Sequence, residues 1–345
     1  MISNSPSVPV HRYAVLDGWR AVSILLVMAG HLLPLGPKYL QLNATVAALG
    51  MAMFFSLSGF LILTTLLENL NVRDFFVRRM LRILPLYIVF ILAVGIITGQ
   101  NSTFYWMYLL FTENFHLPAA DAPHQLAKLV THLWSLCVEV HFYIFIGAWV
   151  GFTKLSAVWI VPLLLCAITV AKLLLPIPVG DETAQTFWRV DEILAGATVA
   201  LMVFQRIPPT LFDVAKRIPI LLVGLLLAAT CHPVMEAHGA LALRPYFALL
   251  LIGQVIERGH TAQFAILRSR PARYIASISY ALYVLHLPAT AGWLGEGDSK
   301  LIIYAKRPLC FALAWAGAHL STRYLETPIV RWGRRLIARR TVVAV

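Results

Sequence analysis

Three ionisable side chains, Asp17, Arg20 and His31, lie in the first apolar segment of the chain, residues 14–35. A charged group inside a membrane-spanning helix costs several kcal/mol unless it is paired or faces a wet cavity, so each of the three is a candidate functional residue. Arg20 and His31 are eleven positions apart, which returns them to nearly the same helical face, about 16 Å apart along the axis. Because an imidazole takes a proton from a hydroxyl near neutral pH, His31 is a candidate general base. The alternative is that His31 only bonds a backbone carbonyl.

A cluster of arginines, Arg78, Arg79 and Arg82, lies at the start of the third apolar segment, residues 82–99. Arg78 and Arg82 are one helical turn apart and share a face. A guanidinium group binds a phosphate through two hydrogen bonds, so the cluster is a candidate site for a cytoplasmic nucleotide with several phosphates. An ordinary basic anchor at the cytoplasmic membrane surface is the alternative.

A carboxylate, Glu139, lies within the fourth apolar segment, residues 131–152, and Ser135 precedes it by one helical turn. A buried carboxylate needs a partner, and Arg20 and His31 are the candidates. A purely structural ion pair is equally compatible with this pattern. The sequence contains no P-loop, HExxH, GxSxG or GxGxxG motif, which removes the commonest nucleotide-binding, zinc-protease and serine-hydrolase interpretations.

The composition sets the class of protein to which these residues belong. Hydrophobic residues make up 59% of the 345 residues and charged residues 13%, far from the roughly half apolar and quarter charged composition of a soluble domain. A soluble enzyme is therefore excluded. The net charge of +12 is distributed in short basic clusters between apolar segments, which argues against nucleic-acid binding. The four cysteines are scattered singly, without a CxxC pair, so we predict no metal site.

We predict an all-α membrane helical bundle in a single domain, residues 1–345, with its core at about 13–335. About ten segments are long enough to cross roughly 30 Å of hydrocarbon, at 14–35, 45–67, 82–99, 131–152, 156–176, 190–205, 218–232, 239–256, 273–291 and 301–321. Placing both termini in the cytoplasm puts most loop arginines inside and acidic loop residues such as Asp121 and Asp181 outside, as the positive-inside rule requires. An aromatic stretch at 104–111 is expected at the membrane interface. The first segment is too long for a signal peptide, and we expect a multi-pass protein of a bacterial inner membrane.

Taken in order, these segments resemble the motifs of the acyltransferase-3 family of membrane acyltransferases. Arg20 and His31 are similar to the family's Arg-x10-His signature. The other matching segments are FFSLSGFLI at 54–62, FVRRMLRILPLY at 76–87, WSLCVEVHFY at 134–143, RVDEILAG at 189–196, ISYALYVLH at 278–286 and YLETP at 324–328. Val140 and His141 stand where many members have Glu-Gln, a departure that bears on the choice of acceptor. We expect no SGNH hydrolase-like extension, so a second transfer step would need a partner protein.

The resemblance implies transfer of an acyl group, usually acetyl, from cytoplasmic acyl-CoA to a hydroxyl of a glycan such as a lipopolysaccharide or exopolysaccharide sugar. Acetyl-CoA is thus the expected donor substrate. The resemblance also implies that Arg20 and His31 are essential and that the arginine cluster at Arg78, Arg79 and Arg82 lies near the coenzyme A phosphates. Glu139 would then orient His31, and the substrate-binding candidates are Asp17, Ser58, Ser135, Arg189, Asp191 and His286. Roles for His31 as general base and as transient acyl carrier both remain open.

A secondary transporter is the alternative from another class, because intramembrane Arg, Glu and His residues also line transport pathways. The sequence shows no similarity between its two halves and no matched pair of Gly/Pro-broken helices, and its polar groups concentrate in the first four segments. We therefore expect an acyltransferase whose partners are acyl-CoA, a glycan or lipid-linked glycan and the lipid bilayer, with no nucleic acid and no metal.

Overall fold

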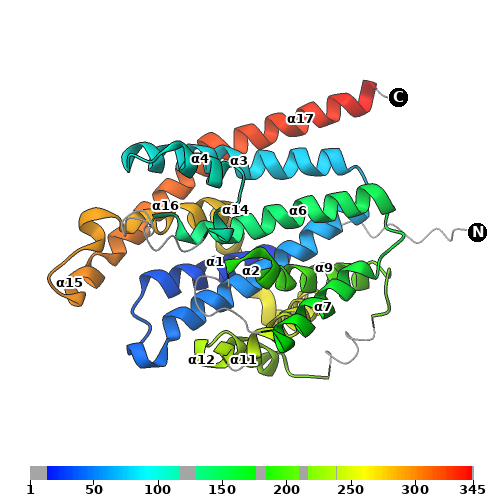
Figure 1. Cartoon of the computed structure of the whole chain (residues 1–345), viewed down its shortest axis with the longest axis horizontal. Coiled ribbons are helices and arrows are strands. Elements are labelled where there is room, and N and C mark those ends of the chain that lie inside the picture. The colour runs from blue at the N-terminus through cyan, green and yellow to red at the C-terminus, as the bar shows by residue number, and fades with distance from the viewer. Residues whose placement is uncertain (1–13, 117–128, 176–183, 210–216, 238, 344–345) are drawn as a thin grey trace, which may run out of the picture.

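The computed structural model describes residues 14–116, 129–175, 184–209, 217–237 and 239–343, and every regular element within these ranges is a helix (Figure 1). The predicted all-α class is therefore confirmed for the described residues. Asp121 and Asp181, two of the acidic residues predicted to lie in external loops, are outside these ranges.

Each of the ten predicted segments overlaps a helix in the structure, and the third of these helices begins ten residues before its predicted segment at 82–99. These helices are α1 (Ala14–Leu32), α2 (Leu42–Glu68), α3 (Val72–Ile97), α6 (Trp134–Thr153), α7 (Ile160–Leu174), α9 (Asp191–Val203), α11 (Ile220–Thr230), α13 (Arg244–Arg258), α14 (Arg270–Leu285) and α16 (Arg307–Ser321).

Six helical stretches within the described residues are long and apolar enough to cross a membrane. They are Ala14–Leu32, Lys38–Glu68, Val72–Ile97, Thr131–Thr153, Ala240–Arg258 and Lys300–Ala338. The remaining four helices, α7, α9, α11 and α14, have 15, 13, 11 and 16 residues, fewer than the roughly 17 residues that a span needs. The number of ten transmembrane helices and the cytoplasmic placement of both termini therefore stay predictions.

The tenth helix extends beyond residue 321, where its predicted segment ends. α16 continues through a π-helical turn, Thr322–Glu326, into α17 (Thr327–Val343), which lies alongside α3 in Figure 1. Gly333 permits this packing, because a Cβ at that position would come within 2.1 Å of the Leu81 side chain. The apolar pattern ends where Arg323 and later arginines begin, but packing against α3 continues the helix.

The predicted interfacial stretch at 104–111 forms most of α4 (Ser102–Leu109). This helix buries Phe104 and Tyr108 and leaves Trp106 exposed, and it packs on α3. Its position at the membrane interface stays a prediction.

The helices α2 and α9 form the centre of the bundle, and every residue of α9 from Asp191 to Met202 is buried. Their backbones touch at two glycines. A Cβ on Gly59 would lie 1.8 Å from the carbonyl oxygen of Ile193, and a Cβ on Gly196 would lie 1.7 Å from that of Ser56. Small residues allow helices in membranes to approach this closely. The contact holds α2 against the helix that follows Arg189.

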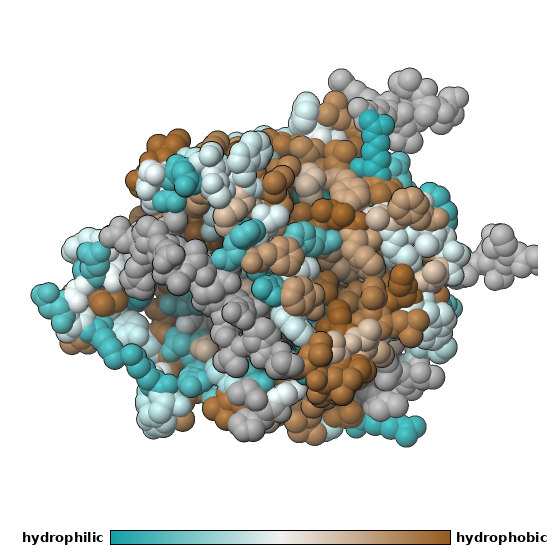
Figure 2. Space-filling view, viewed as in Figure 1, coloured by the Kyte–Doolittle hydropathy of each residue, from teal (hydrophilic) through white to brown (hydrophobic). Residues whose placement is uncertain are grey.

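Large apolar side chains are exposed over much of the surface. Figure 2 shows hydrophobic side chains gathered over a broad part of one face, and Phe152, Ile97 and Leu174 have 90%, 81% and 77% of their surface exposed. A soluble monomer rarely exposes such large apolar areas, whereas the lipid of a bilayer covers them. Together with the six long apolar stretches, this surface identifies a multi-pass integral membrane protein.

Candidate active site

Three histidines from separate segments meet at the C-terminal end of α1. Nδ1 of His31, in the last turn of α1, lies 2.9 Å from Nε2 of His286, the residue that follows α14, and the planes of the two rings are within 10° of parallel. Nδ1 of His286 lies 2.7 Å from the carbonyl oxygen of Tyr283. The ring of His132, just before α6, has its centroid 5.0 Å from that of His286, and its Nε2 lies 3.2 Å from the carbonyl oxygen of Val284. Two residues singled out by the sequence, His31 and His286, are therefore direct partners.

The start of α2 holds the last turn of α1, and with it His31. The side-chain amide of Asn43 donates hydrogen bonds of 2.7 Å and 2.6 Å to the carbonyl oxygens of Gly30 and Leu33. Carbonyls at a helix end have no partner within the helix, and that of Gly30 faces position 34, where Pro34 has no N–H to offer. A Cβ on Gly30 would lie 2.7 Å from the backbone carbonyl of Asn43, so a glycine is needed for this crossing.

A cavity of about 340 Å³ lies beside His31, whose ring is exposed to it. The cavity is lined by small apolar residues of α2 and by polar and aromatic side chains from other elements, among them His31, His132, Trp134, Arg189, Glu236 and Tyr283. A pocket of this size with a few converging polar groups is the usual form of a small-molecule site. Among the residues that the structure describes, no group of three or more His, Cys, Asp or Glu side chains is arranged to hold a metal ion, and a metal-free site stays a prediction.

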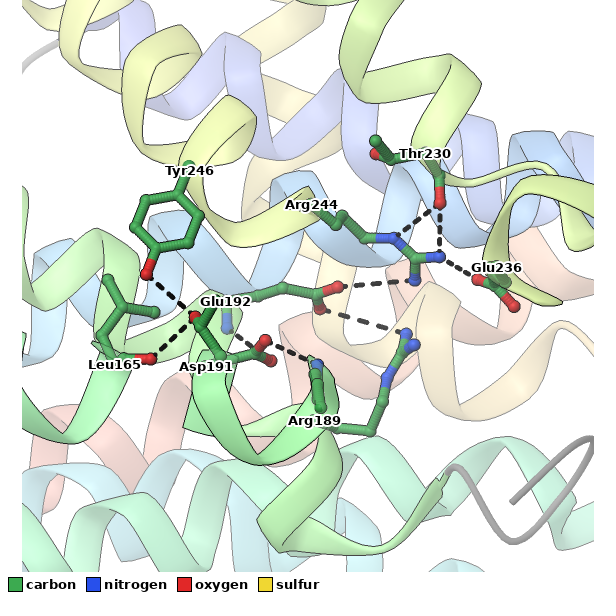
Figure 3. Close-up of polar contacts among 10 residues, drawn as sticks. Leu165, Arg189, Asp191, Glu192, Thr230, Glu236, Arg244 and Tyr246 are labelled. Atoms are coloured by element: carbon green, nitrogen blue, oxygen red, sulfur yellow. Dashed lines mark hydrogen bonds and ion pairs between the residues drawn. The ribbon is translucent and has the colours of Figure 1, made fainter. Parts of the chain in front are cut away.

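Two of the lining side chains, Arg189 at the end of α8 (Thr186–Arg189) and Glu236 in α12 (Pro233–Ala237), are joined by a buried network of charges (Figure 3). Glu192 lies between two cations, 3.9 Å from Arg189 and 3.5 Å from Arg244. Arg244 is fully buried, pairs with Glu236 and donates a 2.8 Å hydrogen bond to the carbonyl oxygen of Thr230. Because buried charges are tolerated only when they are paired, the network fixes Arg189 and Glu236 relative to each other.

Arg189 and Asp191, which the sequence assigned to one substrate site, have different surroundings. Arg189 lines the cavity, with its guanidinium 5.2 Å from the centre of the Trp134 ring. The carboxylate of Asp191 lies 2.6 Å from Nζ of Lys172, and both side chains are 1% exposed. Asp191 therefore ties α9 to α7, while Arg189 presents its charge to the cavity.

Ser135 supports the cavity wall through Tyr283. The two hydroxyl oxygens are 2.5 Å apart, and the Tyr283 hydroxyl donates to the carbonyl oxygen of His132. Because a tyrosine hydroxyl has one hydrogen, Ser135 donates its own hydrogen to Tyr283. Ser135 is 2% exposed, whereas Tyr283 lines the cavity. Within the described contacts, Ser135 thus acts on the cavity through its neighbour.

A second polar cluster surrounds Arg20, about three helical turns from His31 along α1. Arg20 interacts electrostatically with four groups that the sequence had singled out, namely Arg82, Arg79, Asp17 and Glu139. Three guanidinium groups thus share one region with two carboxylates. An excess of guanidinium groups favours an anionic ligand, a phosphate above all.

Glu139 belongs to the polar cluster around Arg20. Its Oε1 accepts a 2.7 Å hydrogen bond from the Tyr143 hydroxyl, and the guanidinium of Arg79 lies 5.6 Å from the centre of the Tyr143 ring. Of the two partners predicted for Glu139, Arg20 is within electrostatic range. The other, His31, has His286 as its hydrogen-bond partner instead.

Two further predicted residues lie outside these contacts. Arg78 is exposed on α3. Ser58 is 7% exposed on α2, next to the glycine that touches α9. Their binding roles stay predictions.

Sequence reasoning assigned no role to His132, Glu236 or Arg244. His132 stands two residues before the WSL motif, but nothing in its neighbourhood indicates a histidine partner. Arg244 lies inside the predicted eighth segment, 239–256, and the cost of placing a charge there was the available signal. Glu236 lies in a connection without any motif, and only its contact with Arg244 shows that it belongs to the site.

Comparison with known proteins identifies the family. A family model described as an acyltransferase domain matches residues 13–317. The chain belongs to this acyltransferase family. The match begins at residue 13, where the predicted core of the domain also begins, and it ends before the YLETP segment at 324–328. It favours the acyltransferase interpretation over the transporter.

Several bacterial acyltransferases are similar to this one in sequence. The putative peptidoglycan O-acetyltransferase YrhL of Bacillus subtilis is 26% identical, in an alignment that covers 96% of this chain and 57% of the relative. The peptidoglycan O-acetyltransferase OatA of Listeria monocytogenes is 26% identical over 92% of this chain and 56% of the relative. A putative O-acetyltransferase of Staphylococcus aureus is 25% identical over 92% and 57%. The chain thus spans little more than half the length of these relatives. No solved structure matches the chain.

Proposed function

We propose that this acyltransferase moves an acyl group, acetyl in the first place, from coenzyme A to a hydroxyl of a glycan bound in the cavity beside His31. The observation that carries the proposal is that His31 is exposed to a cavity that also contains Arg189 and Glu236. A carboxylate accepts hydrogen bonds from sugar hydroxyls, and a guanidinium group donates to sugar oxygens. A base beside such a pair of groups suits a polyhydroxylated acceptor.

The reaction at His31 has two forms that use the same ring nitrogen. In direct transfer, the imidazole takes the proton of the acceptor hydroxyl, and the oxygen attacks the thioester carbonyl carbon. The carbon–sulfur bond breaks, and the leaving thiolate receives the proton. In the two-step form, the imidazole nitrogen itself attacks the thioester carbonyl carbon, the carbon–sulfur bond breaks and coenzyme A leaves as a thiolate. The acceptor hydroxyl then attacks the acyl carbon, the carbon–nitrogen bond breaks and frees the imidazole, and the proton that the hydroxyl loses balances the one that the thiolate takes up.

Arg79 and Arg82 of the predicted cluster, together with Arg20, form the proposed site for the phosphates of coenzyme A; Arg78, the third predicted arginine, is exposed on α3. The position of this site supports the role, because Arg20 lies about 16 Å from His31 along the axis of α1, so an extended donor bound there would point its thioester along the helix. Charge-assisted hydrogen bonds contribute about 1.5–3 kcal/mol each, so losing one weakens donor binding roughly 10- to 100-fold.

A donor without phosphates tests this assignment. We expect Arg82→Gln to raise the KM for acetyl-CoA roughly 10-fold or more, while the KM for acetyl-pantetheine stays unchanged. The matched control is Arg206→Gln, at an exposed arginine three residues beyond the last residue of α9, which should change neither value. If Arg82→Gln raises both KM values equally, the cluster does not bind the phosphates.

The acceptor is proposed to be a glycan of the cell envelope. Two of the relatives are named for the O-acetylation of peptidoglycan, so peptidoglycan joins lipopolysaccharide and exopolysaccharide among the acceptors to test. Radiolabelled acetyl-CoA supplied to envelopes that contain the wild type or His31→Ala, followed by separation of the three glycans, identifies the acceptor by where the label appears.

The same experiment decides the function. Label that requires an intact His31 at equal protein levels is the expected result. Equal label with His31→Ala would remove His31 from the chemistry. Absence of label with every acyl donor tried, in envelopes that contain all three glycans, would contradict acyl transfer.

A further inference from the structure

The hydrogen-bond partners of His286 determine where its single ring proton lies. Its Nδ1 is 2.7 Å from the carbonyl oxygen of Tyr283, and a carbonyl oxygen only accepts hydrogen bonds. The hydrogen must therefore be on Nδ1 of His286. Because a neutral imidazole carries one hydrogen, its Nε2 is an acceptor with a free lone pair.

This lone pair in turn determines the proton position of His31. Nε2 of His286 lies 2.9 Å from Nδ1 of His31, and the two ring planes are within 10° of parallel. At this distance the lone pair of Nε2 accepts a hydrogen bond from its partner. Nδ1 of His31 must then carry the hydrogen and donate it. The other nitrogen of His31, Nε2, is left without a hydrogen, and His31 is exposed to the cavity.

The surroundings hold His286 in this role. Its side chain is fully buried, and its backbone N–H donates a 3.0 Å hydrogen bond to the carbonyl of Leu282, which continues α14 by one residue. The ring of His132 packs edge-on against it at 5.0 Å and is itself held at the Val284 carbonyl. Two backbone carbonyls from the end of α14 thus fix two of the three rings.

We propose that His286 is a positioning residue that selects the tautomer of His31 with the proton on Nδ1 and an unprotonated Nε2. The inference rests on the proposed function for its importance, since Nε2 is the atom that both forms of the reaction need. In other proteins, the tautomer of a functional histidine is set by the hydrogen-bond partner of its second ring nitrogen, and this partner is often a carboxylate or a backbone carbonyl. In this acyltransferase a neutral histidine takes that place.

The position of the proton can be measured without any turnover. Nitrogen-15 NMR of histidine-labelled protein in lipid distinguishes a protonated from an unprotonated ring nitrogen, and the two resonances lost in His31→Asn identify His31. We expect a protonated Nδ1 and an unprotonated Nε2 in the wild type. In His286→Phe, which keeps a ring but offers no acceptor, we expect the Nε2-protonated form to appear. A protonated Nε2 in the wild type, or no change in His286→Phe, would overturn the proposal.

Kinetics provide the second readout, because two substitutions of His286 differ in whether they offer His31 a hydrogen-bond acceptor. The oxygen of a Gln side chain reaches about as far as Nε2 of histidine, so His286→Gln retains an acceptor that His286→Phe lacks. We expect His286→Phe to lower kcat on the order of 100-fold, the lower end of what general base catalysis contributes, with the acceptor KM unchanged. His286→Gln should retain most of kcat. Equal losses in the two variants would indicate a purely structural role and refute the proposal.

A matched control separates this effect from general loss of a histidine. His116 is exposed and bonds a backbone carbonyl at the end of its own loop, so His116→Phe should change neither the His31 resonances nor kcat. If His31 shows the expected tautomer and yet no acyl transfer occurs, the proposed function fails while the tautomer assignment stands. The two inferences can therefore be refuted separately.

Discussion

Arg244 provides a direct test of the buried charge network, because both a disruptive and a compensating substitution are available. Arg244→Met keeps a long side chain but removes a fully buried cation that pairs with Glu192 and Glu236. Breaking a buried pair on one side costs about 3–5 kcal/mol, because the partner keeps an uncompensated charge. We expect the melting temperature in nanodiscs to fall by roughly 5–10 °C. The acceptor KM should rise, because Glu236 loses the cation that holds it at the cavity.

The compensating substitution is Glu192→Gln. In the wild type it removes a partner of Arg244 and should destabilise the fold. In the Arg244→Met background it removes the uncompensated carboxylate instead, so the double variant should be more stable than Arg244→Met alone. We expect a coupling energy of about 1–3 kcal/mol from the four melting curves. Arg206→Met, at an exposed position, is the control and should stay within about 0.5 kcal/mol of the wild type.

Additive losses would refute this reasoning. If the effects of Arg244→Met and Glu192→Gln on the free energy of unfolding add up to that of the double variant within about 0.5 kcal/mol, the two side chains do not depend on each other. The argument that the network positions Glu236 at the cavity would then fail as well.

Three further predictions concern packing, pH and the arginine cluster. Gly196→Ala should prevent recovery of monodisperse protein, because its Cβ would lie 1.7 Å from a backbone carbonyl, whereas Gly224→Ala, with nothing within 4 Å, should be recovered normally; equal recovery in size-exclusion chromatography would contradict the close contact. Burial raises the pKa of Glu113, in the connection before α6, from 4.5 to about 8, so the stability of the neutral carboxyl is fully present below pH 4.5 and is lost as pH rises through about 8. The free energy of unfolding of the wild type should therefore fall between these pH values by up to about 1.4 kcal/mol per pH unit, and the melting temperature should fall with it. Parallel pH curves for the wild type and Glu113→Gln would refute this. Tyr143→Phe removes the hydrogen bond to the buried carboxylate of Glu139 and should lower the rate of acyl transfer about tenfold. Tyr39→Phe, at a residue that is 79% exposed, should leave the rate unchanged. Similar rates for both variants would show that Glu139 is not needed for acyl transfer.

The positions of the helices could be predicted from sequence because the bilayer leaves few choices. A long apolar run must satisfy its backbone internally, and a helix does so. A charge in such a run is costly, which is why Arg20 and Glu139 could be named from sequence, whereas Arg189 was named only through the resemblance to the family. The end of the last helix was not visible, because packing of α17 on α3 and not hydropathy extends it. Likewise, the pattern alone does not show which of the short helices cross the membrane.

The partners of these side chains could not be predicted from sequence. The residue that bonds His31 is 255 positions away along the chain, and the pairing depends on where α14 ends relative to α1. The carbonyl acceptors that orient His286 and His132 belong to the backbone, which carries no residue-specific signal. Asp191 and Lys172 illustrate the same point, since their pairing requires α7 to lie against α9.

The fold also changes the interpretation of two motifs. FFSLSGFLI at 54–62 and RVDEILAG at 189–196 resemble separate family signatures, yet Gly59 and Gly196 within them are the two sides of one helix crossing. Arg189 lies directly before α9, so its place at the cavity depends on this crossing. A substitution at either glycine would therefore abolish transfer by displacing Arg189 rather than by removing a chemical group. Loss of activity alone cannot assign a chemical role to residues of these motifs, and each such variant needs a measurement of the fold beside the measurement of transfer.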